Sequence, residues 1–232
     1  MRATVERTYG VYHFGSSWDL TDRQLNQFIQ LFNTPTDTVD SVLGGRSSVT
    51  IAYLDGIGSA VIKHYTRGGL IRHVVARRYV KWGKPRSQVE YEILQKVKGL
   101  DVNVPEPIAF AYQGRLFYKA WLVTREIKHQ QTLAELSCFD EQQARMAMKA
   151  VGVQIATLIK NHIHHADFHP GNVLVDRTDR VFILDFDKAY VSRGSKSKLR
   201  EKYLMRWQRA VTKHRLPEML IETMSAGLQN IP

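Results

Sequence analysis

The chain has one cysteine, Cys138, and no long apolar run. A lone cysteine excludes an internal disulfide and is typical of a reducing compartment. We expect Cys138 to be a packed small side chain rather than a nucleophile. No stretch reaches the roughly 18 apolar residues of a membrane span, and residues 1–10 lack the apolar core of a signal peptide. The sequence therefore predicts a cytoplasmic protein.

Acidic residues are few: the chain has 22 aspartates and glutamates against 33 lysines and arginines, which gives a net charge of +11. Such an excess of positive charge is typical of proteins that bind nucleic acid, an anionic membrane surface or a polyanionic substrate. The alternative is that the charge has no binding partner and only keeps the protein from aggregating. Residues 67–86 hold no acidic side chain and interleave basic with apolar residues. We expect this segment to contact an anionic bilayer or acceptor, through arginines that include Arg67, Arg72, Arg77 and Arg78.

No repeat, low-complexity tract or linker divides the 232 residues, a length that suits one domain of two lobes. The first half is predicted to be mostly sheet. Thr21 and Gln24 form a capping-box pattern before a short helix. Strands are predicted at 49–53, 59–63, 108–112 and 116–124, and a helix at 87–97.

The second half is predicted to be mostly helical. Asp140 with Gln143 suits an N-cap before a helix from Glu141 to about Lys160. Short strands at 173–175 and 181–184 follow, joined by a turn. A basic helix near 198–214 ends before Pro217, and its basic face either touches membrane or is merely solvated.

The strongest chemical signal is the run from His165 to Asn172, followed by Asp185 after two short strands. An aspartate, an asparagine five residues later and a second aspartate form the arrangement of protein kinases. Phosphoryl transfer needs a carboxylate to take the proton of the attacking hydroxyl, and oxygen ligands to hold Mg²⁺ against the phosphates. We predict Asp167 as the base, Asn172 and Asp185 as metal ligands, and His165 as a structural brace.

Two other interpretations of this run remain. Four histidines, at positions 162, 164, 165 and 169, are compatible with a zinc site, although no second cluster with metal spacing occurs elsewhere. The run is also compatible with an ordinary polar surface loop. Neither alternative explains the spacing of the two aspartates and the asparagine.

A kinase also needs a clamp for ATP. Lys63 ends a predicted strand, as the phosphate-binding lysine of kinases does, and it needs an acidic partner on the next helix. Glu90 is the first candidate partner and Glu92 the second. Upstream, Gly44, Gly45 and Arg46 occupy the place of a glycine-rich phosphate loop, where an ordinary turn is the alternative.

Features of protein-directed kinases are missing. Ala166 stands at the position where protein kinases usually carry an arginine that binds the phosphorylated activation loop. No Ala-Pro-Glu motif follows Asp185, and the chain after Asp185 is too short for the large helical lobe that binds peptide substrates. We therefore expect the acceptor to be a small molecule or a lipid.

Further motifs carry a family resemblance: residues 63–70 (KHYTRGGL), 77–79 (RRY) and 104–107 (VPEP), within a stretch from Gly44 to Trp207. With the catalytic run they resemble the lipopolysaccharide core heptose/Kdo kinase family of Gram-negative bacteria, where Kdo is 3-deoxy-D-manno-octulosonic acid. The resemblance implies ATP- and Mg²⁺-dependent phosphorylation of a Kdo hydroxyl, expected at position 4, on a Kdo-bearing lipid A precursor. It implies a peripheral protein at the cytoplasmic face of the inner membrane. It implies no nucleic acid and no protein partner.

The predicted fold is α+β, a bilobal protein-kinase-like domain covering residues 1–232. We expect a five-stranded antiparallel N-lobe with one helix over about 1–124, a hinge over about 125–128, and a reduced, mainly helical C-lobe over about 129–232. One departure from the family, residues 168–171 (FHPG), is more similar to aminoglycoside and choline phosphotransferases. The alternatives are therefore such a small-molecule kinase, a heptose kinase, an atypical protein kinase or a nucleic-acid-binding pseudokinase.

Overall fold

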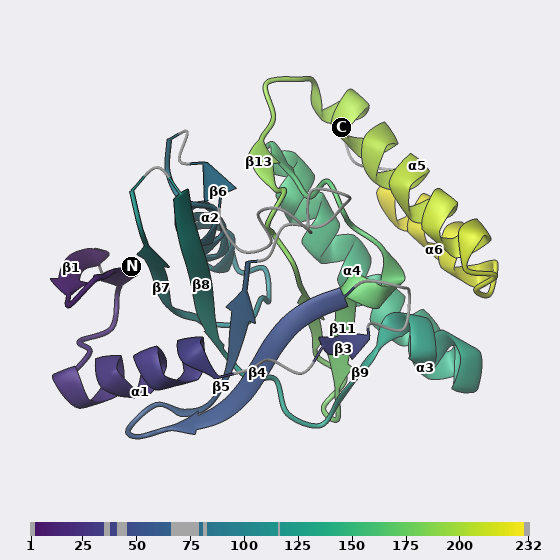
Figure 1. The fold of residues 1–232 in the computed structure, drawn as a ribbon. Helices are drawn as coiled ribbons and strands as arrows, with labels where there is room; N and C mark the ends of the chain where they lie inside the picture. The colour runs from purple at the N-terminus through teal and green to yellow at the C-terminus, as the bar shows by residue number, and fades with distance from the viewer. Residues whose placement is uncertain are drawn as a thin grey trace. The chain divides into compact units, whose positions relative to one another are not determined.

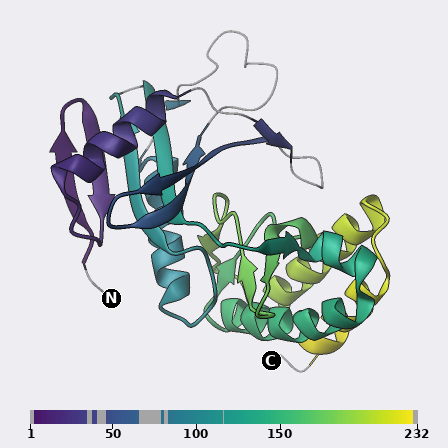
Figure 2. The same cartoon turned by 90° about the horizontal axis from the view of Figure 1, so that it is seen from below.

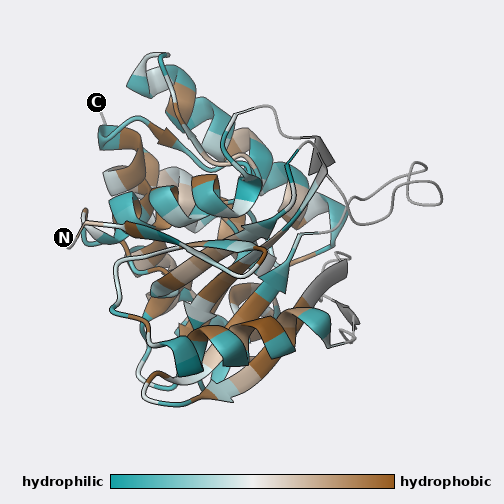
Figure 3. Ribbon diagram, turned by 60° about the vertical axis from the view of Figure 1, so that its left-hand side comes forward, coloured by the Kyte–Doolittle hydropathy of each residue, from teal (hydrophilic) through white to brown (hydrophobic). Residues whose placement is uncertain are grey.

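The structure, a computed structural model, describes residues 3–34, 38–40, 46–65, 79–80, 83–115 and 117–229. The chain divides into two compact units. The first comprises Met1–Gln95 and Glu106–Glu126, and the second Lys96–Pro105 and Ile127–Pro232. Hydrophobic residues gather on the strands and on the inward faces of the helices (Figure 3). Of the helices that the structure describes, none has the length and apolar character needed to cross a membrane.

The first unit is an antiparallel sheet with two helices (Figure 1). Its strand order is β1-β2-β7-β8-β5-β4-β3, and β6 pairs separately with β8. The strands are β1 (Val5–Tyr9), β2 (Tyr12–Ser16), β3 (Thr38–Asp40), β4 (Arg46–Leu54), β5 (Gly58–His64), β6 (Tyr79–Val80), β7 (Pro107–Gln113) and β8 (Phe117–Arg125). The helices are α1 (Asp22–Asn33) and α2 (Arg86–Lys98).

The predicted α+β class is confirmed, and the sheet is larger than the five strands expected. The β1–β2 hairpin extends it, because β2 pairs with β7 along its whole length. Short strands β3 and β6 add to β4 and β8. The unit carries both helices that the sequence patterns predicted, α1 after the Thr21 capping box and α2, where the expected N-lobe had one helix.

One face of the sheet is covered by α1. Thr21 and Gln24 form the predicted capping box at its start. The buried side of α1 then presents Phe28 and Phe32, and the Phe32 ring stacks on Trp121 of β8 with centroids 4.5 Å apart. Aromatic and aliphatic side chains from β2, β5, β7 and β8 complete this core. Burial of several large aromatic rings is a major stabilising contribution for this unit.

The opposite face meets α2. Side chains alternate along a strand, so Ile62 joins the core beneath α1 while its neighbour Lys63 projects to the other side. On β7 the same alternation turns Phe110 toward Tyr91 of α2, with ring centroids 5.3 Å apart. Gly15 of β2 pairs with Phe110, and a Cβ there would lie 2.2 Å from the ring. Only glycine leaves room for this ring across the sheet.

The second unit packs helices around two small antiparallel sheets (Figure 2). Strands β12-β11-β9 form one sheet, and β10 pairs with β13. Its strands are β9 (Gln130–Thr132), β10 (Ile163–His164), β11 (Val173–Asp176), β12 (Val181–Ile183) and β13 (Tyr190–Val191). Its helices are α3 (Leu133–Phe139), α4 (Glu141–Lys160), the short 3₁₀ helix η2 (Pro170–Asn172), α5 (Lys196–Lys213) and α6 (Met219–Leu228).

Helix α4 is the centre of this unit. It begins as predicted, with the Asp140 carboxylate accepting a hydrogen bond from the Gln143 backbone N–H at 2.9 Å. Along its buried face α4 packs against α3 and α6. At the α4–α6 contact two glycines face each other, and a Cβ on Gly152 would lie 3.9 Å from the Cα of Gly227. Small residues let the two helices approach closely.

The expectation that Cys138 is a packed side chain was wrong. Its side chain is exposed. It lies near the end of the short helix α3, whose buried residues are Leu133, Ala134, Leu136 and Ser137. The next position on the helix, Cys138, falls outside this packed side.

The turn between β11 and β12 is organised by one buried carboxylate. Asp176 Oδ1 accepts hydrogen bonds from the backbone N–H and hydroxyl of Thr178, at 2.8 and 2.7 Å. Asp176 Oδ2 accepts from Arg180 Nε at 2.9 Å. Burial acts to raise the pKa of Asp176, but these hydrogen bonds outweigh it and lower the pKa to about 2. The turn therefore depends on the ionised carboxylate.

We expect Asp176→Asn to lower the free energy of unfolding at pH 7 by about 1–3 kcal/mol, because backbone and side-chain donors lose their charged acceptor. A lowered folded-state pKa stabilises the fold above the unfolded-state pKa, and this contribution is lost as pH falls through the folded value. The difference from wild type should thus shrink between about pH 4 and pH 2. Urea unfolding across this range measures it, with Asp101→Asn at an exposed position as control. A difference that does not change with pH would contradict the assignment.

Candidate active site

The loop after β10 brings Asp167 and Asn172 together. The Asn172 side-chain Nδ2 donates to the backbone carbonyl of Asp167 at 3.0 Å. His169 closes the turn before η2, because its Nδ1 accepts from the Gly171 N–H at 3.1 Å and its carbonyl accepts from the Asn172 N–H at 2.8 Å. With Nδ2 engaged in this way, the Asn172 amide has Oδ1 left to offer as a ligand.

A second set of bonds joins this loop to the segment that ends in Asp185. The Leu184 N–H donates to the Asn172 carbonyl at 2.9 Å. The Leu184 carbonyl accepts from His165 Nε2 at 2.7 Å, which requires the proton of the ring to sit on Nε2. Asp185 follows directly, with φ of 60°. Aspartate adopts this left-handed conformation more readily than most residues.

His165 is the brace that the sequence predicted. Its side chain is buried, and its ring packs edge-on against Phe186 with centroids 4.6 Å apart. Burial lowers the pKa of His165 and so keeps the imidazole neutral. The residue thereby fixes the Asp167 loop against the segment that leads to Asp185.

One partner of Asp167, Arg206, was not predicted from the sequence. Arg206 of α5 donates from Nη2 to Asp167 Oδ1 and forms an ion pair with it. Burial acts to raise the pKa of Asp167, but the hydrogen bond and charge of Arg206 outweigh it, and the pKa lies below its ordinary value. In the sequence, Arg206 is one of many basic residues on a predicted basic helix.

Helix α5 is fixed to the loop by two aromatic residues on either side of Arg206. The Tyr203 hydroxyl accepts from the His165 N–H at 2.9 Å and donates to the Ile163 carbonyl at 3.0 Å. The Trp207 ring stacks on Phe168 with centroids 4.9 Å apart. Phe168 opens the segment that departs from the family pattern, and here it serves packing.

We expect Tyr203→Phe to lower the free energy of unfolding by about 1–3 kcal/mol, because a buried N–H and a buried carbonyl both lose their partner. Tyr190→Phe is the matched control, since Tyr190 is exposed. Urea or thermal unfolding of the three proteins measures the difference. Equal stability of Tyr203→Phe and wild type would show that the two bonds contribute nothing.

In the first unit, the structure pairs Lys63 with Glu90. Lys63 Nζ lies 2.8 and 3.1 Å from the two carboxylate oxygens, and the Tyr65 hydroxyl donates to Glu90 Oε2 as well. The Glu90 side chain is 3% exposed and that of Lys63 is 23% exposed. Glu92, the second candidate, instead pairs with Lys84 on the surface at 2.7 Å.

We expect Glu90→Gln to lower the free energy of unfolding by about 1–3 kcal/mol and to raise the KM for ATP roughly tenfold, because Lys63 loses its charged, buried partner. Glu92→Gln removes the same charge from an exposed pair on the same helix, so its effect should stay below about 1 kcal/mol. Urea unfolding and ATP-dependent kinetics compare the two variants. Equal effects would rule out a special role for the Lys63–Glu90 pair.

Several predicted residues lie outside what the structure describes. These are Gly44, Gly45, Arg67, Arg72, Arg77 and Arg78, together with the side chain of Arg46. Their roles stay predictions.

The described residues disfavour the zinc interpretation. No group of three or more histidine, cysteine, aspartate or glutamate side chains within the described ranges is arranged to hold a metal ion. His165 and His169 use ring nitrogens for the loop bonds given above, and His162 Nδ1 lies 3.2 Å from the Gly194 carbonyl.

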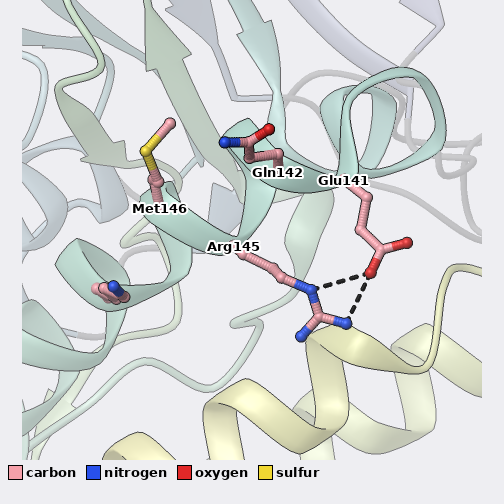
Figure 4. Close-up of a pocket in the computed structure, with 5 residues that line it drawn as sticks. Glu141, Gln142, Arg145 and Met146 are labelled. Carbon is pink, nitrogen blue, oxygen red and sulfur yellow. Dashed lines mark hydrogen bonds and ion pairs between the residues drawn. The ribbon is translucent and has the colours of Figure 1, made fainter.

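A shallow hollow on the outer side of α4 is a separate feature (Figure 4). Arg145 donates from Nε and Nη2 to Glu141 Oε1, at 2.9 and 2.6 Å, across this surface. The hollow is lined by Glu141, Gln142, Arg145, Met146 and Lys149. None of these belongs to the kinase pattern.

Comparison with known proteins gives one consistent result. A family model described as "Lipopolysaccharide kinase (Kdo/WaaP) family" matches residues 30–227. A protein of Vibrio vulnificus (strain CMCP6) named 3-deoxy-D-manno-octulosonic acid kinase is 33% identical over 175 residues, which cover 74% of this chain and 72% of the relative. Proteins of the same name are 33% identical over 153 residues in Vibrio cholerae serotype O1, covering 65% of this chain and 64% of the relative, and 27% identical over 175 residues in Xylella fastidiosa (strain M23), covering 74% and 69%.

With the α+β fold and the kinase pattern, these similarities define a phosphotransferase that acts on a hydroxyl group. More specifically, the chain belongs to the lipopolysaccharide kinase (Kdo/WaaP) family. The resemblance seen in the sequence is thereby confirmed.

Proposed function

We propose that this protein transfers the γ-phosphoryl group of ATP to the 4-hydroxyl of Kdo on a Kdo-bearing lipid A precursor. The names of the relatives support Kdo as the acceptor. The observation that carries the chemistry is the bond from Asn172 Nδ2 to the Asp167 carbonyl, continued by the bond from the Leu184 N–H to Asn172. These bonds support the proposal, because they join the segments that carry the proposed base and the two proposed oxygen ligands.

In this proposal Asp167 is the general base. Its carboxylate accepts the proton of the attacking hydroxyl as the oxygen forms a bond to the γ-phosphorus. The bond from that phosphorus to the β–γ bridging oxygen breaks, and its electron pair leaves with ADP. Asp167 stays ionised beside Arg206, so it is ready to accept the proton.

The donor set fits Mg²⁺. The Asn172 amide oxygen and the Asp185 carboxylate are hard oxygen ligands, which this ion prefers. When bound, the ion would neutralise charge on the ATP phosphates. Lys63, fixed by Glu90, would hold the α- and β-phosphates.

The proposal includes peripheral attachment at the cytoplasmic face of the inner membrane. The net charge of +11 favours an anionic lipid surface, where each nearby cation contributes about 1 kcal/mol. The same charge disfavours a cationic acceptor such as an aminoglycoside or choline.

The test is transfer of labelled phosphate from ATP, with Mg²⁺, to lipid A precursor with and without Kdo, followed by NMR of the product. We expect label only on the Kdo-bearing acceptor, with the phosphate on the 4-oxygen. Heptose-bearing core and an aminoglycoside are the comparison acceptors. Label on one of these and none on Kdo would overturn the acceptor, while a different Kdo oxygen would overturn only the position.

A further inference from the structure

Arg206 occupies a defined place beside the proposed base. It lies on α5 between Tyr203 and Trp207, the two residues that hold this helix against the Asp167 loop. Its Nη2 contacts Asp167 Oδ1. The Arg206 side chain nevertheless remains 31% exposed. A cation is therefore held at the base and is still open to a ligand.

The guanidinium has donors to spare. An arginine carries five N–H groups in a planar fork. Within the part of the chain that the structure describes, Asp167 is the one hydrogen-bond partner found for it. Nε and Nη1 are thus available for a second anion, and a carboxylate matches the fork better than any neutral group.

The acceptor hydroxyl must come within hydrogen-bond distance of Asp167 to lose its proton. A residue in contact with that carboxylate therefore lies next to the acceptor sugar itself. The relatives are named for an octulosonic acid, and a sugar acid carries a carboxylate at neutral pH. The base and the acceptor carboxylate would then share one guanidinium.

We infer that Arg206 binds the carboxylate of the sugar-acid acceptor and so selects an acidic sugar and orients its hydroxyl toward Asp167. This inference rests on the proposed function. Arg206 is a binding and positioning residue in it and takes no part in proton transfer. The other anion that reaches the base during the reaction is the γ-phosphate of ATP, and the test separates the two.

The test uses four proteins and two acceptors. The proteins are wild type, Arg206→Gln, Arg206→Lys and Arg209→Gln, the last removing the same charge from an exposed position on the same helix. The acceptors are Kdo-bearing lipid A precursor and its Kdo methyl ester, both dispersed in detergent. KM and kcat are measured for each acceptor and for ATP.

We expect Arg206→Gln to raise the KM for the acid acceptor about tenfold or more, because a charged hydrogen bond is lost, and to leave the KM for ATP within about twofold. The ester should raise the wild-type KM by a similar factor and should bind Arg206→Gln no worse than it binds wild type. Arg206→Lys keeps the charge without the fork and should lie between. Arg209→Gln should behave as wild type.

A rise in the KM for ATP instead would assign Arg206 to the γ-phosphate and overturn the inference. Equal losses on acid and ester would do the same, and would leave Arg206 acting through Asp167 alone. If Arg206→Gln fails to fold, Arg206→Lys and the ester on wild type still decide the matter. If wild type transfers no phosphate to the acid acceptor, the proposed function itself fails. If wild type is active and the Arg206 variants keep its KM for the acceptor, only the inference about Arg206 fails.

Discussion

Replacing Asp167 by asparagine is expected to lower kcat for phosphoryl transfer by about 10²–10⁴-fold, because the attacking hydroxyl loses its proton acceptor. Asparagine keeps the shape of the side chain, and the backbone carbonyl that receives Asn172 is untouched. Arg206 would lose an ion pair, but it is partly exposed and can be hydrated. Stability should therefore change little, by about 1 kcal/mol.

Single-turnover transfer of labelled phosphate measures the rate, and ATP binding and thermal unfolding serve as controls. Wild-type ATP affinity together with a large loss of rate would identify a residue of the chemical step. A kcat within about tenfold of wild type would remove Asp167 from that role.

Asp185→Asn is the second change with a large expected effect. The loss of one negative charge from the proposed ligand set should weaken Mg²⁺ binding and lower kcat by about 10²–10³-fold at a fixed Mg²⁺ concentration. Asparagine accepts the left-handed backbone at this position, where φ is 60°. The substitution thus tests the carboxylate rather than the fold.

Asp179→Asn is the matched control, because Asp179 has the same φ of 60° and an exposed side chain in the same unit. Activity is measured over a series of Mg²⁺ concentrations. We expect Asp185→Asn to need more Mg²⁺ for half-maximal rate and Asp179→Asn to match wild type. An unchanged Mg²⁺ dependence in Asp185→Asn would assign the metal to other ligands.

Local patterns predicted much of the fold. The helix caps at Thr21 and Asp140 are confirmed. They could be predicted because each capping side chain bonds to a backbone N–H only three residues away and needs no tertiary contact. The strands on either side of the Asp176 turn were also predicted, since both are short apolar runs around turn residues. These features depend on neighbours in the sequence.

Features that depend on distant residues were missed. Arg206 reaches Asp167 across 39 positions, and the sequence shows it as one of many basic residues. The β1–β2 hairpin had a readable signal, with Gly10 in its turn and Tyr12 and Phe14 alternating inward, but its pairing with β7 is a long-range contact. Helix α6 begins two residues after Pro217 and was not predicted. In the sequence pattern Pro217 signals only the end of α5, although a proline also commonly stands near the start of a helix.

The N-terminal hairpin has a practical meaning for anyone who wishes to prepare this enzyme. The family model begins at residue 30, inside α1. Yet Tyr12 and Phe14 belong to the aromatic core, and the Tyr12 ring lies 5.7 Å from that of Trp121. A fragment trimmed to the matched span would strip β7 of its neighbouring strand and open that core to water. The span matched by the family model and the physical unit of folding therefore begin at different residues, and a stable preparation must start upstream of β1.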